Sequence, residues 1–575
     1  MKKNLRSNRQ NADGFMSGVL VLSLSTVIVK VIGLAYKIPM ISYLGAEGMG
    51  YFNSAYEIYA MLCVIATAGL PMALSLLISA NRQRGSASSI RRIDRGAMTV
   101  FLGLGTVGMV FLLAFARPIA KAIGNEDAFF CILAIAPALF FVCFSSAIRG
   151  YFQGFHRMMP TAISQLIEAF GKLIFGIWFA SIALKQGHSL PIVAASAILG
   201  LSFGTFISAI YLLVIKLMAR RTHTLCLSHT AEDSTHDGVK TLLRIAFPIT
   251  LSASILSVTR LVDMAFIMRR LQTIGYSVLE VNEIYGAYTT LAVPVFSLLP
   301  SLIAPISMAL VPQLSAAIAR RSNEDQASIA DRSIRLSVLL AMPASMGVAV
   351  YATPILSILF SKQHEVIQIA APLLSILGLS ILFSGLITTT NAILQSYRQT
   401  IKPMISMSLG AVIKVVFAYL LIGNPSVGVY GAPISTLLCD IAVTCINLHF
   451  LSEVIPKSKD SSGVCQMYYK PMVASLLSIL ASLAVYIPLV RIEVGLPVAF
   501  FCAMVTAVMI YAAFSVFLKI VTAEDVALIP MGTRLLRWRQ DRSMNHKNSI
   551  NHQKKDEKNY DDQRKNSSID DKNTI

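Results

Sequence analysis

The sequence predicts an all-α polytopic membrane protein. Hydrophobic residues make up 55% of the 575 residues, charged residues only 14%, and the mean hydropathy is +0.65. A soluble globular protein needs about 25% charged residues to cover its surface, so most of this surface must face lipid. The composition therefore excludes a soluble enzyme, a disordered protein and a disulfide-rich secreted domain.

Continuous apolar runs predict about 14 transmembrane helices, since one span takes about 20 residues. None of the runs alternates as transmembrane strands do. Their approximate bounds are residues 15–36, 52–80, 97–116, 128–148, 160–184, 190–215, 245–268, 285–318, 336–360, 366–394, 403–422, 430–452, 471–490 and 496–518. The first run carries no signal-peptide cleavage pattern and is predicted to remain as a span.

Lys and Arg are unevenly distributed over the connecting segments. With the N-terminus inside, the inner segments carry 26 Lys/Arg and 10 Asp/Glu, whereas the outer ones carry 8 and 7. Because basic residues stay on the cytoplasmic side, both termini are predicted to be cytoplasmic. The net charge of +19 thus sets topology and gives no support for nucleic-acid binding. Residues 520–575, poor in apolar side chains, are predicted to form a disordered cytoplasmic tail.

An internal duplication relates the two halves of the chain. The sequence ARPIAKAIG (116–124) matches ATPILSILF (352–360) at an offset of 236 residues. The pair Gln153 and Lys172 flanks a proline, as does the pair Gln395 and Lys414, at an offset of 242 residues.

These matches predict two pseudo-symmetric six-span lobes, residues 1–222 and 238–452, followed by two extra spans within 471–519. Six is an even number, so both lobes enter the membrane from the same side. Two parallel lobes can rock around a central site and expose it to each side in turn. This organisation favours a transporter over a channel or a membrane-embedded enzyme.

Eight ionisable residues interrupt the apolar runs. A charge at mid-bilayer costs about 2.5–3.5 kcal/mol, so it is retained where it faces a wet cavity or a partner. The eight are Lys30, Glu57, Glu168, Lys172, Arg260, Asp263, Lys414 and Asp440.

The basic members of this set predict a cavity for an anionic substrate. Lys30 lies midway along the first span, and Arg260 holds a comparable place in the seventh. We expect each to face a central cleft from its own lobe. Lys414 has Gly410, rather than an acid, four residues before it, so it is predicted to be unpaired and available to the cavity.

The acidic members allow ion pairing or ion coupling. Glu168 and Lys172 have the i, i+4 spacing that predicts an intrahelical ion pair, with a place for Lys172 in the cavity as the alternative. Asp263 follows Arg260 by three residues and is predicted to pair with it, or else to bind a coupling cation or proton.

Two further acids lie in the spans. Glu57 is predicted to reach water near the outer end of its span. Asp440, in the twelfth span, is a candidate for ion coupling.

Several motifs are absent from the sequence. A Walker A motif is lacking, so ATP is not predicted to be the direct energy source. Neither an HExxH motif nor a CxxC pair is present. No metal and no cofactor are predicted.

Four short motifs carry a resemblance to a known family. They are LGAEGMG (44–50), AYEIY (55–59), TAGLP (67–71) and RGYFQG (149–154). With their surroundings they resemble the stage V sporulation protein B and MurJ-type exporters, which share a superfamily with the MATE transporters and the O-antigen flippases. The resemblance covers both halves of the chain and excludes the tail.

The resemblance implies a V-shaped fold of two lobes that moves undecaprenyl-linked sugars across the bacterial cytoplasmic membrane. It also implies that the extra spans, 471–490 and 496–518, hold the lipid tail. Lys30 matches the first basic cavity position of the family, and Tyr36, with Lys37 beside it, stands at the second. Cys63 replaces a basic residue of the MurJ type in the second span. These departures are closer to the Gram-positive sporulation branch than to a lipid II exporter.

The function expected from these observations is translocation of an undecaprenyl-diphosphate-linked cell-wall saccharide, a peptidoglycan precursor. The mechanism is alternating access driven by membrane potential or an ion gradient, and no enzymatic activity is expected. The expected partners are the lipid-linked oligosaccharide, membrane lipid and a coupling monovalent cation or proton.

Two alternatives stay open. A MATE-like drug or metabolite cation antiporter would use acid-lined cavities. A multispan glycosyltransferase or polymerase would need a large outer loop, and the outer loops here are short.

Overall fold

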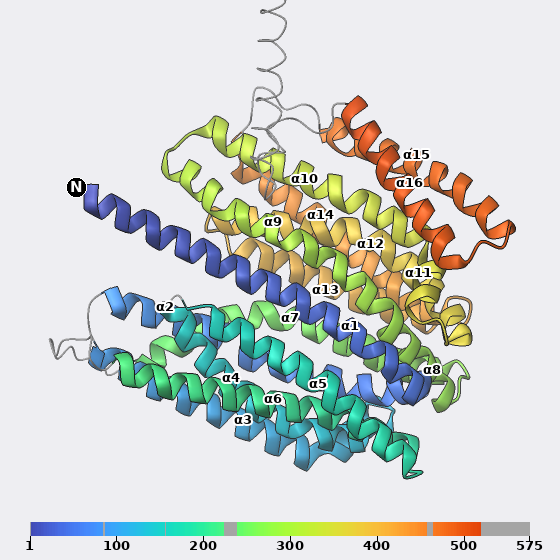
Figure 1. The fold of residues 1–575 in the computed structure, drawn as a ribbon, viewed down its shortest axis with the longest axis horizontal. Coiled ribbons are helices and arrows are strands. Elements are labelled where there is room, and N and C mark those ends of the chain that lie inside the picture. Colours follow the sequence, from blue (N-terminus) through green and yellow to red (C-terminus); the bar gives the residue numbers. More distant parts are fainter. Residues whose placement is uncertain (1, 84–86, 156, 224–237, 457–463, 519–575) are drawn as a thin grey trace, which may run out of the picture.

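A computed structural model describes residues 2–83, 87–155, 157–223, 238–456 and 464–518, and every regular element in these ranges is helical (Figure 1). The elements, in chain order, are α1 (Lys2–Thr67), α2 (Gly69–Gln83), α3 (Ala87–Ile123), η1 (Glu126–Ala128), α4 (Phe129–Gly154), α5 (Met159–Lys185), α6 (Leu190–His223), α7 (Gly238–Thr273), α8 (Val278–Ala287), η2 (Tyr288–Ala292), α9 (Val293–Ala319), α10 (Asn323–Val350), α11 (Ala352–Leu359), α12 (His364–Ser396), α13 (Ile401–Ile422), η3 (Gly428–Tyr430), α14 (Gly431–Val454), α15 (Val464–Arg491) and α16 (Leu496–Phe517). The predicted tail, 520–575, lies outside the described residues, as does most of the connection between the two predicted lobes.

The predicted all-helical membrane architecture is confirmed. The described part of the chain contains 13 helical stretches long and apolar enough to cross a membrane. The first of them, Leu24–Arg82, is 59 residues long and includes the predicted run 52–80 and the run 15–36 from Leu24 onward. The remaining stretches correspond one to one with the other predicted runs.

The chain reverses direction within α1 at Gly45. This glycine has φ 64° and ψ −178°, a conformation in which a Cβ atom would be strained. The ring centroids of Tyr36 and Phe52, which are 16 residues apart in sequence, come within 6.1 Å of each other. A straight helix would separate them by about 24 Å at 1.5 Å per residue. The two limbs of α1 are therefore packed against each other as two crossings.

The helices form two groups (Figure 1). Helices α2 to α6 pack on one another and are called the N-terminal group. Helices α9, α10, α12, α13 and α14 do the same and are called the C-terminal group. Helices α1 and α7 lie between them: α1 contacts α4, α5 and α6 on one side and α8 and α9 on the other, and α7 contacts α2, α3 and α13. The hairpin of α15 and α16 packs on α10 and α11.

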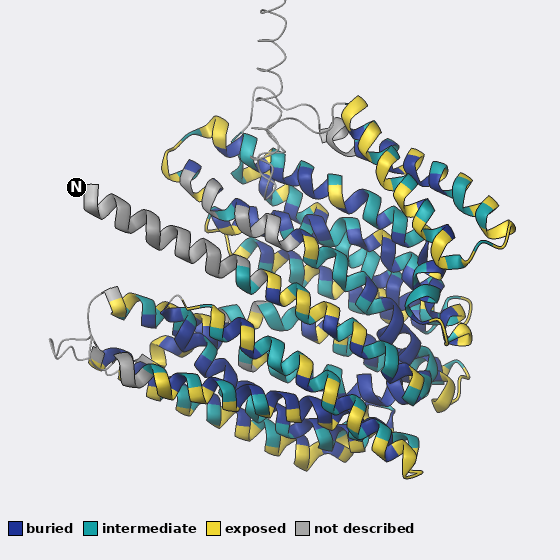
Figure 2. Cartoon of the chain, in the orientation of Figure 1, coloured by how far each residue is buried: buried dark blue, intermediate teal, exposed yellow. Residues whose placement is uncertain are grey.

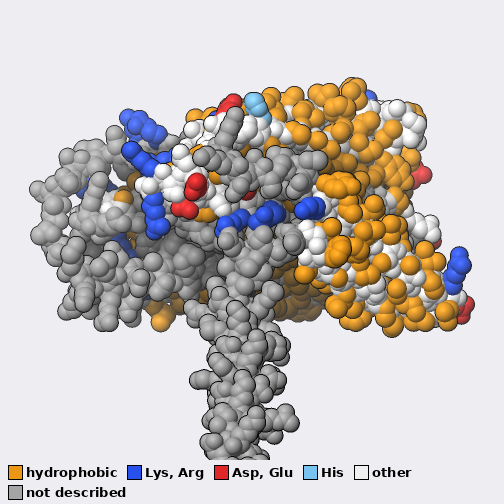
Figure 3. All heavy atoms as spheres, turned by 90° about the horizontal axis from the view of Figure 1, so that it is seen from above, with side chains coloured by type: hydrophobic (Ala, Val, Ile, Leu, Met, Phe, Trp, Pro, Cys, Tyr) orange, Lys and Arg blue, Asp and Glu red, His pale blue; other side chains and the backbone are white. Residues whose placement is uncertain are grey.

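The outer surfaces of both groups are apolar. Exposed residues line the outward faces of the helices in Figure 2, and they include large side chains such as Trp178, Phe203 and Phe501. Hydrophobic side chains cover much of the face seen in Figure 3, whereas Lys and Arg gather mostly toward the end at which the N-terminus lies. This pattern suits a molecule whose sides contact lipid.

The predicted run 285–318 is interrupted in the structure. Helix α8 ends at Ala287, a π-helical turn, η2, follows, and α9 begins at Val293. Pro294, the second residue of α9, lacks a backbone N–H, so one hydrogen bond of a regular α-helix is missing at this point. The proline-rich span therefore contains a local change of helix type.

Candidate functional site

A cavity of about 380 Å³ opens between α1 and the N-terminal group. Its volume lies within the range of ordinary small-molecule sites. Polar and charged side chains line much of it: Thr26, Lys30, Tyr36, Tyr56, Arg149, Gln165, Glu168 and Lys172. Lys30, Lys172 and Tyr36, which were predicted as cavity residues, are thus brought together, whereas Arg260 and Lys414 do not line this cavity.

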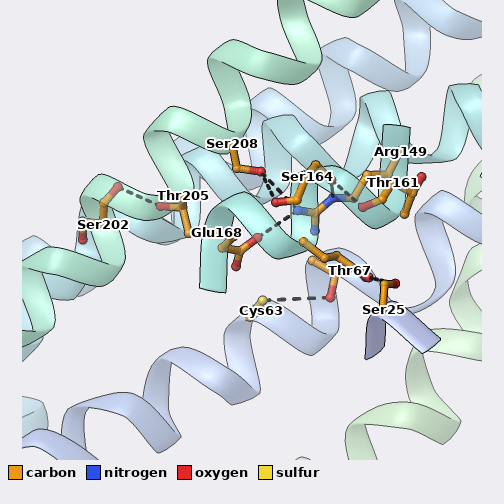
Figure 4. A network of polar contacts seen from close by, with 11 residues as sticks. Ser25, Cys63, Thr67, Arg149, Thr161, Ser164, Glu168, Ser202, Thr205 and Ser208 are labelled. Carbon is orange, nitrogen blue, oxygen red and sulfur yellow. Dashed lines mark hydrogen bonds and ion pairs between the residues drawn. The ribbon is translucent and has the colours of Figure 1, made fainter. Parts of the chain in front are cut away.

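The predicted ion pair between Glu168 and Lys172 is wrong, because Glu168 pairs with Arg149. The distance from Arg149 Nη2 to Glu168 Oε2 is 2.8 Å. Arg149 Nε donates to Ser164 Oγ at 2.9 Å, and Ser208 Oγ donates to the carbonyl of Ser164 at 2.9 Å (Figure 4). The forked guanidinium meets the carboxylate and a hydroxyl at once, which a lysine cannot do in one fixed geometry. Three helices, α4, α5 and α6, are joined by this network.

Lys172, left without the acid, lies among aromatic rings. Its Nζ is 5.0 Å from the ring centroid of Tyr36, 5.8 Å from that of Phe52 and 4.7 Å from that of Tyr56. Ring faces attract an ammonium within about 6 Å without neutralising its charge. No acid of the described chain lies within ion-pair distance of Lys172. Its charge is therefore available to an anion in the cavity.

Lys30 and Arg260 come from different helices, and the expectation that both face one central cleft stays a prediction, because Arg260 is not among the cavity-lining residues. Lys30, on α1, is exposed in the cavity and its Nζ donates to the carbonyl of Ser297 on α9 at 3.3 Å. Arg260, on α7, is also exposed and lies within electrostatic reach of Lys30. Tyr36 is buried, and its hydroxyl donates to the carbonyl of Ala197 at 3.4 Å.

The prediction that Lys414 is unpaired and the prediction that Asp263 pairs with Arg260 are both wrong. Lys414 and Asp263 form an ion pair with each other. Lys414 Nζ lies 2.6 Å from Asp263 Oδ2, and the two side chains are only 9% and 10% exposed. Helices α7 and α13 pack side by side, so the partner of Lys414 comes from another helix rather than from the preceding turn. Lys414 is consequently neutralised, and the ion-pair contact of Asp263 is with Lys414 rather than with Arg260.

The remaining acids lie inside the same charged region. Ser384 Oγ donates to Asp440 Oδ2 at 2.6 Å, which joins α12 to α14. Glu57 is half-buried, and the charged groups that act on it are Arg260, Lys37, Asp263 and Lys414. Glu57 thus lies within electrostatic reach of interior charges, and its access to water stays a prediction.

The sequence offset of 242 residues also relates two hydrogen-bond networks. At this offset Arg149 corresponds to Asn391, Ser164 to Ser406 and Lys172 to Lys414. In the C-terminal group, Ser406 Oγ donates to Asn447 Oδ1 at 2.6 Å, and Asn447 Nδ2 donates to Asn391 Oδ1 at 2.9 Å. The position of Glu168 is taken by Gly410, so the C-terminal network is uncharged where the N-terminal one holds an ion pair.

Arg149 and Lys37 lie outside the predicted spans 128–148 and 15–36, and neither was counted among the interior charges. Arg149 lies on α4 and lines the cavity, and Lys37 lies within α1. The signal for Arg149 was its place in the RGYFQG motif. The signal for Lys37 was the apolar sequence that continues to Leu44 beyond the predicted end of the first span.

At the end of the molecule opposite the N-terminus, α1 and α8 approach closely. A Cβ atom at Gly286 would collide with the carbonyl of Ala46, and one at Gly50 would collide with the backbone of Asn282. Asn125 Nδ2 donates to Asn282 Oδ1 at 2.7 Å and to Ser54 Oγ at 3.2 Å, and all three residues are buried. We call Ala46, Gly50, Asn125, Asn282 and Gly286 the α1–α8 seal.

No group of three or more His, Cys, Asp or Glu side chains in the described ranges is arranged to hold a metal ion. The site is instead an assembly of cations, aromatic rings and hydroxyls.

Comparison with known proteins finds membrane flippases and transporters among the proteins similar to this chain. The family model "Polysaccharide biosynthesis protein" matches residues 15–318, and the MatE model matches residues 277–420. Stage V sporulation protein B of Bacillus subtilis is 24% identical over 77% of this chain and 85% of its own length. The Lipid II flippase MurJ of the same organism is 25% identical over 70% of this chain and 76% of its own length.

The fold is shared with solved transporter structures. A structure of the lipid II flippase MurJ in an inward closed conformation superposes with a TM-score of 0.67 and 14% identity, covering 87% of this chain and 99% of that one. An inward-facing multidrug resistance MATE family transporter of the MOP superfamily gives a TM-score of 0.60 and 15% identity, covering 78% of this chain and all of that one. The first family model spans more than half of the sequence, and the chain belongs to the polysaccharide biosynthesis protein family.

Proposed function

We propose that this protein flips an undecaprenyl-diphosphate-linked cell-wall saccharide, a peptidoglycan precursor, across the bacterial cytoplasmic membrane. The observation that carries the proposal is the cavity beside α1, where Lys30 and Lys172 have no acid partner in the described chain. A cation without an acid partner is energetically unfavourable inside a membrane protein, and an anionic ligand would supply the missing counter-charge. The similarity to a lipid II flippase and to a sporulation protein agrees with such a ligand.

Each cavity residue has a distinct part in binding. Lys172 and Lys30 supply positive charge to the diphosphate from the cavity wall, and Arg260, which lies outside the lining but within electrostatic reach of Lys30, adds to it. Arg149 is held by Glu168 and shapes the wall of the cavity. Tyr56, which lines the cavity and is half-buried, offers an aromatic face and a hydroxyl to the saccharide.

The transport cycle we propose is alternating access. The two lobes, 1–222 and 238–452, rock about α1 and α7, and the α1–α8 seal closes one end of the pathway in the conformation described here. The saccharide crosses between the lobes while the polyprenyl chain stays in lipid beside α15 and α16. When the protein returns to its starting conformation without ligand, the uncompensated Lys and Arg charges of the pathway move within the membrane potential. Each charge moved across 100 mV is worth about 2.3 kcal/mol, so the potential can drive this step.

A MATE-like cation antiporter is the second candidate, because the MatE model matches residues 277–420. Its coupling cation or proton would bind an interior acid. Asp263 already has Lys414 as its counter-ion, whereas Asp440 accepts only a hydrogen bond from Ser384, so Asp440 is an acid to test. Efflux of a cationic dye that is lost in Asp440→Asn would favour this function over the flippase.

Complementation of a flippase-deficient strain tests the main proposal. The double variant Lys30→Ala/Arg260→Ala should fail to support growth while it accumulates in the membrane at the wild-type level, because the ligand loses a cation from each side of the pathway. Lys185→Ala/Arg491→Ala, which removes two exposed charges at helix ends, is the matched control and should complement. Growth with the expressed Lys30→Ala/Arg260→Ala variant would contradict the cavity assignment.

A further inference from the structure

Lys37 is an interior cation rather than a loop residue. It lies on the first limb of α1, two turns after Lys30, and is half-buried. Its Nζ donates to the backbone carbonyl of Thr289 at 2.6 Å. Lys30 and Lys37 therefore share a helix face and both reach the span formed by α8, η2 and α9.

The carbonyl of Thr289 is left free by the helix to which it belongs. In an α-helix it would accept from the N–H of Val293, but in the π-helical turn that N–H donates to Tyr288. The next donor in the π pattern is residue 294, which is a proline and has no N–H. A buried carbonyl without a hydrogen-bond donor is unfavourable, and the Lys37 ammonium supplies the donor that the helix lacks here.

The hydrogen bond from Lys37 satisfies the Thr289 carbonyl, but it does not neutralise the charge of the ammonium. A carbonyl offers a dipole and no opposing charge, and no acid in the described ranges lies within ion-pair distance of Lys37. The charged groups that act on it are Lys172, of like sign, and Glu57. Two interior ammonium groups within electrostatic reach of each other gain most from an anion that contacts both.

We propose that Lys37 is a diphosphate-binding residue of the transport pathway, and that the Thr289 carbonyl is its acceptor only while the pathway is empty. A phosphate oxygen makes a charge-assisted hydrogen bond, which is stronger than a bond to a neutral carbonyl. On arrival of the ligand, Lys37 exchanges Thr289 for phosphate and joins Lys172 on the same anion. The exchange also removes one link between α1 and the η2 turn, so ligand binding loosens the contact between the two sides of the pathway. This inference rests on the proposed function.

Binding of undecaprenyl diphosphate to the purified full-length protein in detergent tests the inference, with undecaprenol as the uncharged control. The wild type should bind the diphosphate and gain thermal stability from it. Lys37→Gln should weaken binding about tenfold or more, and Lys37→Arg should stay near the wild type because it keeps the charge. Lys185→Gln, at an exposed helix end, should bind as the wild type does.

The outcomes separate the two proposals. If the wild type does not bind undecaprenyl diphosphate in preference to undecaprenol, the proposed function fails. If the wild type binds and Lys37→Gln binds equally well, the role of Lys37 fails while the function stands. A lower melting temperature of ligand-free Lys37→Gln with an unchanged dissociation constant would likewise overturn the binding role, since Lys37 would then be structural. If Lys37→Gln does not fold, Lys37→Met, which keeps most of the apolar stem, is measured in the same way.

Discussion

Lys172 and Lys414 occupy corresponding positions, 242 residues apart, in opposite electrostatic settings. Lys414 has a carboxylate at 2.6 Å, whereas Lys172 has aromatic rings around its ammonium and no acid of the described residues within ion-pair distance. The difference follows from one neighbouring position. Glu168 engages Arg149 in the N-terminal group, and its counterpart in the C-terminal group is Gly410, which gives room for α14 to approach.

Substituting the two lysines by methionine should separate a binding role from a structural one. Lys414→Met leaves the Asp263 carboxylate buried and unpaired, and the expected loss of stability is about 3–5 kcal/mol. Lys172→Met removes a half-buried charge that has no acid within ion-pair distance in the described chain, so the protein should stay folded and lose transport. Thermal unfolding in detergent and growth complementation measure the two effects.

The double variant Lys414→Met/Asp263→Asn serves as the control, because it removes both charges and should recover most of the stability. Loss of stability in Lys172→Met and none in Lys414→Met would contradict this division of roles.

At the scale of residues, the sequence predicted which charges are interior but not how they pair. Lys30, Lys172 and Tyr36 do line one cavity, since a charge within an apolar run has few other places to go. The partners of Glu168 and Lys414 come from neighbouring helices at large sequence separations. Spacing along one helix carries no information about such contacts.

The two limbs of α1 bring the cavity and the seal onto one element. The first limb carries Lys30 and Lys37. The second limb carries Gly50, which contacts α8, and Ser54, which accepts a hydrogen bond from Asn125. Closure at the α1–α8 seal depends on the absence of a side chain at Gly286, because the carbonyl of Ala46 occupies the space of its Cβ atom.

Gly286→Ala should therefore push α1 and α8 apart and open this end of the pathway. A cysteine introduced at Ser54, which is buried here, should react faster with a membrane-impermeant maleimide in Gly286→Ala than in the parent. Gly347→Ala is the matched control, because a Cβ atom there meets no atom within 4 Å. Equal labelling rates in the two alanine variants would show that the α1–α8 contact does not seal the pathway.

At the scale of elements, apolar runs were sufficient to predict the spans. They did not predict the reversal at Gly45 or the π-helical turn at Tyr288–Ala292. The reversal depends on one glycine in a left-handed conformation, and the turn lies between α1-contacting helices just before Pro294, which cannot donate a backbone hydrogen bond. Both are set by tertiary packing rather than by hydrophobicity.

For the whole molecule, the excess of Lys and Arg at one end fixes the orientation that we expect. Figure 3 shows these residues gathered mostly toward the N-terminal end, and the inner segments carry 26 of them against 8 in the outer segments. Basic segments are retained in the cytoplasm, so the α1–α8 seal should lie on the outer side.

Cysteines introduced at two exposed glutamines test this orientation. Gln186→Cys, between α5 and α6, should react with an impermeant maleimide in intact cells, and Gln399→Cys, between α12 and α13, should react only after permeabilisation. The reverse pattern would place the seal on the cytoplasmic side. The direction of transport in the proposal would then have to change.

The central claim is that interior cations beside α1 move a diphosphate-linked saccharide across the bilayer. The most direct measurement is reconstitution of the purified protein into vesicles that contain lipid II, followed by a count of the headgroups accessible to an enzyme added outside. The wild type should bring inner-leaflet lipid II within reach of the enzyme, and Lys30→Ala/Arg260→Ala should not exceed protein-free vesicles. Accessibility equal to that of protein-free vesicles with the folded wild type, across lipid II and other undecaprenyl-diphosphate-linked sugars, would contradict the account.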